Sequence, residues 1–142
     1  KRLKKKYGKL FQLFIDFHGH SSKQNVFTYG PPFERSADQY IEGTNFGDID
    51  ARLLPQLIAN RTTLFRADES SYQVPKSKLN TARAVLFNKY KIPFCYTVEA
   101  SYGLADGGLH LTNEHYVEVG RKIAQASEEF CSFLSNKCTE TG

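Results

Sequence analysis

Three short runs of bulky apolar residues have the length and composition of β-strands. They cover residues 10–17 (LFQLFIDF), 25–29 (NVFTY) and 94–98 (FCYTV). The first run is almost continuously apolar, which is typical of a strand covered on both faces, as in the parallel sheets of α/β proteins. We therefore expect these strands to lie in the interior of a layered domain.

Three other segments carry apolar residues at helical spacing. They are residues 51–61, with Asp50 as the predicted cap, residues 77–90, and a long amphipathic helix that Thr112 caps. Pro55 predicts that the first of these helices is short or kinked. The stripe of the last helix comprises Tyr116, Val119, Ile123, Ala126, Phe130 and Leu134. Strands interleaved with helices predict an α/β fold, with a mixed, mostly parallel sheet flanked by helices.

Two of the predicted strands end in residues that carry chemistry. The first ends in His18-Gly19-His20, and the last continues into Glu99. In open α/β sheets ligands bind beyond the carboxyl ends of the strands. An imidazole and a carboxylate delivered to one edge are typical of a metal-hydrolase site, with Asp16 or a backbone carbonyl as the acceptor that orients His18. Taken singly, His18 is also consistent with a hydrogen-bonded core histidine, and Glu99 with an ordinary charge at a strand end.

Charge is concentrated at one end of the chain. Of its 19 Lys and Arg residues, six lie within residues 1–9, which leaves 13 basic and 15 acidic residues elsewhere. A nearly neutral body argues against a broad nucleic-acid-binding face. The basic head, residues 1–9, is consistent with a solvated helix end, a nuclear signal, a membrane-surface patch or a binder of acidic protein tails.

Cysteine usage and hydropathy favour the cytoplasm. The three cysteines are an odd number without a CxxC pair, and Cys95 lies in an apolar run where a buried, reduced thiol is the usual occupant. No stretch reaches the roughly 18 apolar residues that a membrane span needs, and no signal peptide is recognisable. We expect neither nucleic acid nor membrane as a partner.

Several motifs together resemble a known family. Residues 14–21 and 25–30 match the motifs DxHGHS and NxFxYG, and residues 76–78, 81–83 and 96–102 match the motifs KxK, TxR and YTxE. These motifs, in this order, resemble those of the cytosolic carboxypeptidases. That family consists of M14-type zinc metallocarboxypeptidases and includes tubulin deglutamylases. The resemblance runs from about residue 10 to about residue 135, and it implies part of a zinc carboxypeptidase-like fold.

The resemblance also implies roles for individual residues. His18 is similar to the family's third zinc ligand, and Glu99 to the general base that takes a proton from the attacking water. Arg83 matches the position expected to face the side chain of the residue being removed, where a guanidinium selects glutamate. Otherwise Arg83 is a solvated helix residue. Lys76 and Lys78 either add positive potential near this pocket or are ordinary surface lysines.

The family's first two zinc ligands, an HxxE motif, and its clamp for the substrate carboxylate lie upstream of the matched region. We therefore expect residues 1–142 to be the carboxyl-terminal portion of one catalytic domain. The amino-terminal remainder of the same polypeptide would be its partner, and without it sheet edges and apolar faces would be exposed. The chain's own HxxE sequence, His115 to Glu118, lies on the last predicted helix, where we expect it on the solvent face. His20 is expected to order the turn.

The implied function is removal of glutamates from acidic protein tails such as those of tubulin, with one zinc ion per complete catalytic domain. Action in the cytoplasm, with association with microtubules or cilia, follows from the same resemblance. Two alternatives remain open: a catalytically incomplete homologue that binds acidic tails, and a zinc-dependent deacylase of acyl-amino acids.

Overall fold

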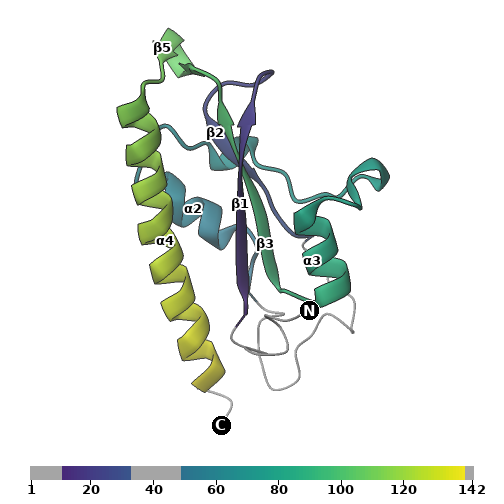
Figure 1. The fold of residues 1–142 in the computed structure, drawn as a ribbon. Helices are drawn as coiled ribbons and strands as arrows, with labels where there is room; N and C mark the ends of the chain where they lie inside the picture. The colour runs from purple at the N-terminus through teal and green to yellow at the C-terminus, as the bar shows by residue number, and fades with distance from the viewer. Residues whose placement is uncertain (1–10, 33–48, 140–142) are drawn as a thin grey trace.

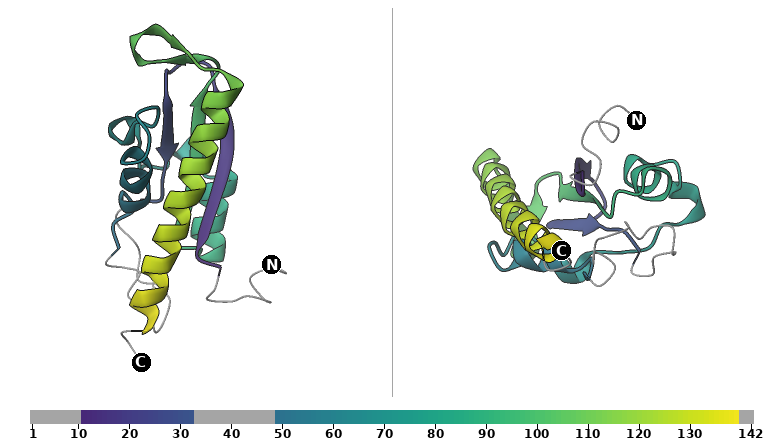
Figure 2. Two further views of the ribbon diagram at one scale, coloured as in Figure 1. Left: turned by 90° about the vertical axis from the view of Figure 1, so that its left-hand side faces the viewer. Right: turned by 90° about the horizontal axis from the view of Figure 1, so that it is seen from below.

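The computed structural model describes residues 11–32 and 49–139, so the basic head, residues 1–9, lies outside the described residues. A central sheet lies between α3 on one face and α2 and α4 on the other (Figures 1 and 2). The sheet strands and helices are β1 (Leu13–His20), β2 (Val26–Tyr29), α2 (Leu53–Ala59), α3 (Ala82–Tyr90), β3 (Phe94–Ser101) and α4 (Asn113–Thr139). A hairpin of β4 (Leu104–Ala105) and β5 (Leu109–His110) joins β3 to α4.

The sheet is mixed, as predicted. Its strand order is β1-β3-β2, with β1 parallel to β3 and β2 antiparallel to β3. The α/β class is therefore confirmed. The central strand, β3, is buried from Phe94 to Val98, which explains why this run lacks polar alternation.

One face of the sheet packs against α2 and α4 and forms the larger core. Ile15 of β1 and Tyr96 and Val98 of β3 project onto this face, because alternate residues of a strand point to the same side. The predicted stripe of α4 meets them, and from Val119 to Leu134 all of its members are buried. The long helix is therefore amphipathic because it covers a sheet along its length.

The opposite face is apolar near the beginning of the strands and polar near their carboxyl ends. Phe14 and the buried Cys95 pack against Phe87 of α3 in a second, smaller core. Farther along the same face the strands present Asp16, then His18 opposite Glu99. Figure 1 shows α3 beside the lower part of the sheet only. The residues of this face near the carboxyl ends of the strands line a pocket instead.

Strand boundaries differ from the sequence-based ones. β1 continues through His20 and β3 through Ser101, because the two strands keep pairing in parallel register over these residues. The polar residues therefore lie within the paired sheet rather than beyond it. β2 begins at Val26, since Asn25 has a positive φ of 63° that an extended strand cannot include.

Helix starts also differ. The helix predicted from residue 77 begins at Ala82, and the Lys76–Lys78 segment forms a separate 3₁₀ turn. Asp50 is not the cap of α2: its carboxylate accepts the backbone N–H of Arg52, two residues on, and the helix begins at Leu53.

Pro55 lies in the first turn of the short α2, where its missing N–H costs no helical hydrogen bond. Thr112 does precede α4, and its backbone N–H donates to Nδ1 of His115 over 3.0 Å. None of the described helices is both long and apolar enough to cross a membrane.

The Phe94–Phe130 contact yields a first test. The two rings are fully buried and meet edge-to-face, with centroids 4.9 Å apart. Phe130→Ala should lower the free energy of unfolding by about 3–5 kcal/mol, since it leaves a cavity in the larger core. Urea denaturation followed by circular dichroism measures the change. Phe133→Ala, at a position on the same helix that is 39% exposed, is the matched control and should cost under about 1 kcal/mol. Equal losses in the two variants would contradict the proposed packing of α4.

Candidate active site at the carboxyl end of the sheet

Parallel pairing places His18 directly beside Glu99. The two residues are partners in the register of β1 and β3, and neighbouring strands lie about 4.8 Å apart. Side chains at paired positions of parallel strands project from the same face. The structure therefore brings the predicted imidazole and carboxylate to one rim of the sheet.

The two side chains line a pocket of about 690 Å³. Asp16, Thr97 and Tyr29 form part of its floor, and the segment that leads into α3 forms one wall. Of the predicted site residues, those that line this pocket are His18, Lys78, Arg83 and Glu99. Lys76 does not line it and is exposed on the 3₁₀ turn. The volume is within the range of small-ligand sites.

His18 is not a core histidine. Its side chain is 56% exposed, and its Nδ1 lies 3.3 Å from Oδ2 of Asp16. The carboxylate of Asp16, the orienting group expected from the sequence, thus lies close to Nδ1, and Nε2 is the ring nitrogen on the side away from it. A histidine held in this way by a carboxylate is the usual arrangement at metal sites.

Arg83 is not a solvated helix residue either. It lies in the first turn of α3, is only 5% exposed, and donates from Nη1 to the carbonyl of Gly30 over 2.9 Å. Its guanidinium lies over the ring of Tyr29, 5.6 Å from the centroid. Burial lowers the pKa of Arg83, while Tyr29, Cys95 and Glu99 favour the charged form. A buried cation on the wall of a pocket is well placed to bind an anionic group.

The other two residues of the His-Gly-His sequence contact the exposed ring of Tyr102 and the turn that follows β1. The ring of Tyr102 lies so close to Gly19 that a Cβ at residue 19 would be 2.2 Å from it. Nδ1 of His20 accepts the backbone N–H groups of Ser22 and Lys23, at 3.0 and 3.2 Å. The expectation that His20 orders the turn is confirmed.

Sequence reasoning missed Tyr29 and Thr97. Tyr29 lines the pocket and lies beneath the guanidinium of Arg83, and Thr97 lies two residues before Glu99 on the same face. Strand alternation around Glu99 was a sufficient signal for Thr97. Nothing local identifies Tyr29, because its place depends on the antiparallel pairing of β2 with β3.

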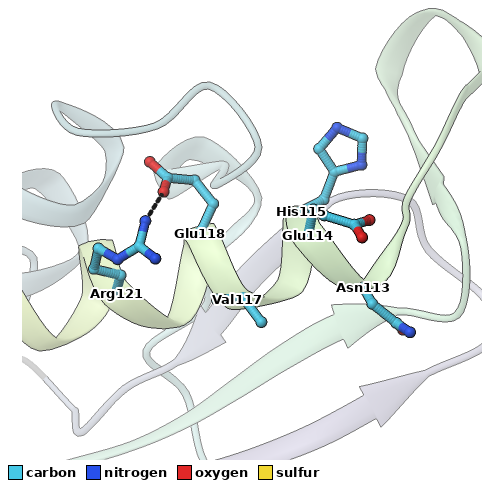
Figure 3. A pocket seen from close by; sticks show the side chains of 6 residues that line it. All are labelled: Asn113, Glu114, His115, Val117, Glu118 and Arg121. Atoms are coloured by element: carbon cyan, nitrogen blue, oxygen red, sulfur yellow. Dashed lines mark hydrogen bonds and ion pairs between the residues drawn. The ribbon is translucent and has the colours of Figure 1, made fainter.

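The HxxE sequence on α4 lies in a separate, shallow depression on the surface of the helix (Figure 3). His115 uses Nδ1 to accept the backbone N–H of Thr112, and Glu118 accepts from Arg121 over 2.7 Å. Both groups are therefore engaged in local helix contacts, and the expected surface position is confirmed. Within residues 11–32 and 49–139, no three His, Cys, Asp or Glu side chains are grouped so that they could hold a metal ion.

Comparison with known proteins gives this geometry a context. No family model matches the chain. The chain is 35% identical over 94 residues to cytosolic carboxypeptidase 4 of Mus musculus, and this match covers 63% of the chain and 8% of that protein. It is 31% identical over 131 residues to cytosolic carboxypeptidase 1 of Danio rerio, and this match covers 87% of the chain and 11% of that protein. Over most of its length, the chain is homologous to cytosolic carboxypeptidases.

The similarity to cytosolic carboxypeptidases is confined to a segment, because the chain spans about a tenth of the length of these curated relatives. A solved structure supports the fold. The chain superimposes on a metallo-carboxypeptidase from Burkholderia cenocepacia with a TM-score of 0.64 at 15% identity, over 86% of the chain and 31% of that structure. The three-stranded mixed sheet and its helices are thus a piece of a carboxypeptidase fold.

Proposed function

We propose that this chain is the carboxyl-terminal portion of a metallocarboxypeptidase catalytic domain, and that the complete protein removes glutamates from the ends of acidic protein tails. The observation that carries the proposal is the pairing of His18 with Glu99 in one pocket whose wall contains the buried Arg83. Homology to cytosolic carboxypeptidases supports the reaction class.

The described residues fit one part of a zinc site. His18, oriented by Asp16, has the chemistry of a single imidazole ligand, whereas catalytic zinc sites use three protein ligands. The remaining two would come from outside the described residues. Zinc, when bound, supplies a Lewis acid that polarises the carbonyl of the bond to be cleaved.

The chain's own residues would divide the remaining work. The carboxylate of Glu99 takes a proton from the attacking water and passes it to the departing amine, so that the carboxylate is regenerated after each turnover. Arg83 pairs with the side-chain carboxylate of the terminal glutamate, and the exposed Lys78 adds positive charge at the pocket wall. Lys76, outside the pocket, is assigned to the surface.

The edge of the sheet supports the domain proposal. Among the described strands β1 has a neighbour on one side only, and Phe17 of β1 is 62% exposed. An apolar strand edge of this kind is normally covered. The amino-terminal remainder of the polypeptide would cover it, and would also bring the missing zinc ligands and the clamp for the terminal carboxylate.

The proposed substrates are glutamate-rich tails such as those of tubulin, met in the cytoplasm and at microtubules or cilia. One observation favours a second candidate, a binder of acidic tails that does not cleave them: the metal-ligand set is incomplete within the described residues. Zinc-dependent glutamate release by the complete gene product distinguishes the two.

Glu99→Gln should lower hydrolysis by roughly 10²–10⁴-fold in the complete gene product, because the amide cannot accept the proton. Release of glutamate from a peptide that ends in glutamate measures turnover, and fluorescence anisotropy should show that binding is retained. Glu118→Gln, which changes a carboxylate on α4, is the matched control and should leave turnover unchanged. Undiminished hydrolysis by Glu99→Gln would remove this residue from the base role.

Arg83→Ala should lower kcat/KM for glutamate-ending peptides by roughly 10–100-fold, the size expected for losing a hydrogen bond to a charged group. Zinc content should not change, and the preference for glutamate over leucine termini should disappear. Arg83→Lys keeps the charge and should recover part of that preference, and thermal melting of both variants checks folding. A folded Arg83→Ala protein with wild-type glutamate preference would contradict the assignment.

Asp16→Asn should weaken zinc binding by about 10–100-fold, since the amide orients His18 less well than the carboxylate does. Competition with a chelator measures the affinity without reference to activity. Asp68→Asn, at a surface position paired with Arg66, is the control. Identical zinc affinities in the two variants would show that Asp16 does not support a ligand.

A further inference from the structure

Phe27 of β2 is a fully buried ring beside the proposed base, and the proposed reaction gives it no part. In the register of β2 and β3 it is the partner of Glu99, and the Cβ atoms of such partners lie about 4.5–5.5 Å apart on one face of the sheet. On the other side of β3, the partner of Glu99 is His18 of β1. The carboxylate of Glu99 therefore projects between an imidazole and a phenyl ring.

Three side chains hold the ring of Phe27 in place. The rings of His20 and Tyr29 meet it edge-to-face, with centroids 5.4 and 5.6 Å away, and Nζ of Lys23 lies over it, 4.5 Å from its centroid. His20 belongs to β1 and Phe27 to β2, so their contact crosses the central strand β3, beginning at the level of Glu99. The ring is therefore a fixed wall on the β2 side of this carboxylate.

The two sides of Glu99 differ in what they offer a carboxylate. Toward β2 the group would give up water for contact with a phenyl ring, which forms no hydrogen bond with it, and such an exchange is unfavourable. Toward β1 it meets the pocket, whose lining includes Glu99 and His18 but not Phe27. The ring thus leaves the carboxylate the side on which His18 lies.

We propose that Phe27 is a positioning residue for the general base, whose ring confines the carboxylate of Glu99 to the His18 side of β3. This inference rests on the proposed function, in which Glu99 takes a proton from the attacking water, and deepens it. Placement of the base matters because a misplacement of about 1 Å can cost about 10²-fold in rate. The ring acts through Glu99 and contacts neither substrate nor metal, so its removal should slow turnover without weakening binding.

In the complete zinc-loaded protein, Phe27→Val should lower kcat for a glutamate-ending peptide by about 10–100-fold, because the carboxylate gains the vacated space as a second position. KM should not change, and neither should zinc affinity, measured by competition with a chelator. Phe27→Leu keeps most of the side-chain volume and should recover most of kcat.

Phe65→Val is the matched control, since Phe65 is a buried ring of the larger core that does not line the pocket. Both valine variants should lower the melting temperature, because each leaves a cavity. Only Phe27→Val should lower kcat, measured at a temperature at which all variants are folded.

Wild-type kcat in Phe27→Val, an equal loss in Phe65→Val, or a loss in Phe27→Leu as large as in Phe27→Val would overturn the proposal. Crystal structures test it without activity. The wild-type structure should place the carboxylate of Glu99 on the His18 side, and that of Phe27→Val should show a second position toward β2. A wild-type carboxylate turned toward β2, or a single unchanged position in the variant, would also overturn it. Should the wild-type protein cleave no glutamate-ending peptide, the proposed function fails separately, and the crystal structures still decide on Phe27.

Discussion

The backbone hydrogen bonds between β1 and β3 hold eight residue pairs in parallel register, from Leu13 opposite Phe94 to His20 opposite Ser101. Slipping this register by one residue would turn the polar set of β1 into the core and its apolar set into the pocket. Burial of Ile15, Tyr96 and Val98 against α4 opposes such a slip. The apolar core on one face thereby determines which side chains meet on the other.

The same register explains how a nonpolar strand can end in a polar site. A parallel strand needs cover on both faces, and α2 and α4 supply it on one face from the start of the strands to Ile15 and Val98, whereas Phe17 on that face is 62% exposed (Figure 1). On the other face α3 covers only the part around Phe14 and Cys95. The part of this face that α3 leaves uncovered lines the pocket. The buried Arg83, in the first turn of α3, lies where the smaller core meets the pocket.

Burial of Arg83 shows how the fold tunes a charged group. Its Nη1 hydrogen bond to Gly30 and the ring of Tyr29 offset part of the cost of removing the guanidinium from water. Burial still lowers the pKa of Arg83. An ion pair between an anionic ligand and this guanidinium is therefore stronger here than it would be at the surface. The packing of α3 that buries Arg83 is therefore consistent with specificity for an acidic side chain.

The amino-acid sequence by itself determined the α/β class, the existence of each main strand and helix, and the presence of an imidazole, His18, and a carboxylate, Glu99, near the ends of two strands, because apolar periodicity and local motifs are properties of neighbouring residues. It misplaced the starts of α3 and β2, since Thr81 has the extended backbone angles of an N-cap residue and Asn25 has a positive φ that ends the strand. Tertiary structure alone decided that His18 is exposed, that Arg83 is buried, and that Tyr29 joins the pocket. These facts depend on which strands pair and what covers them, and pairing between distant segments is set by the burial of the whole chain rather than by any local pattern.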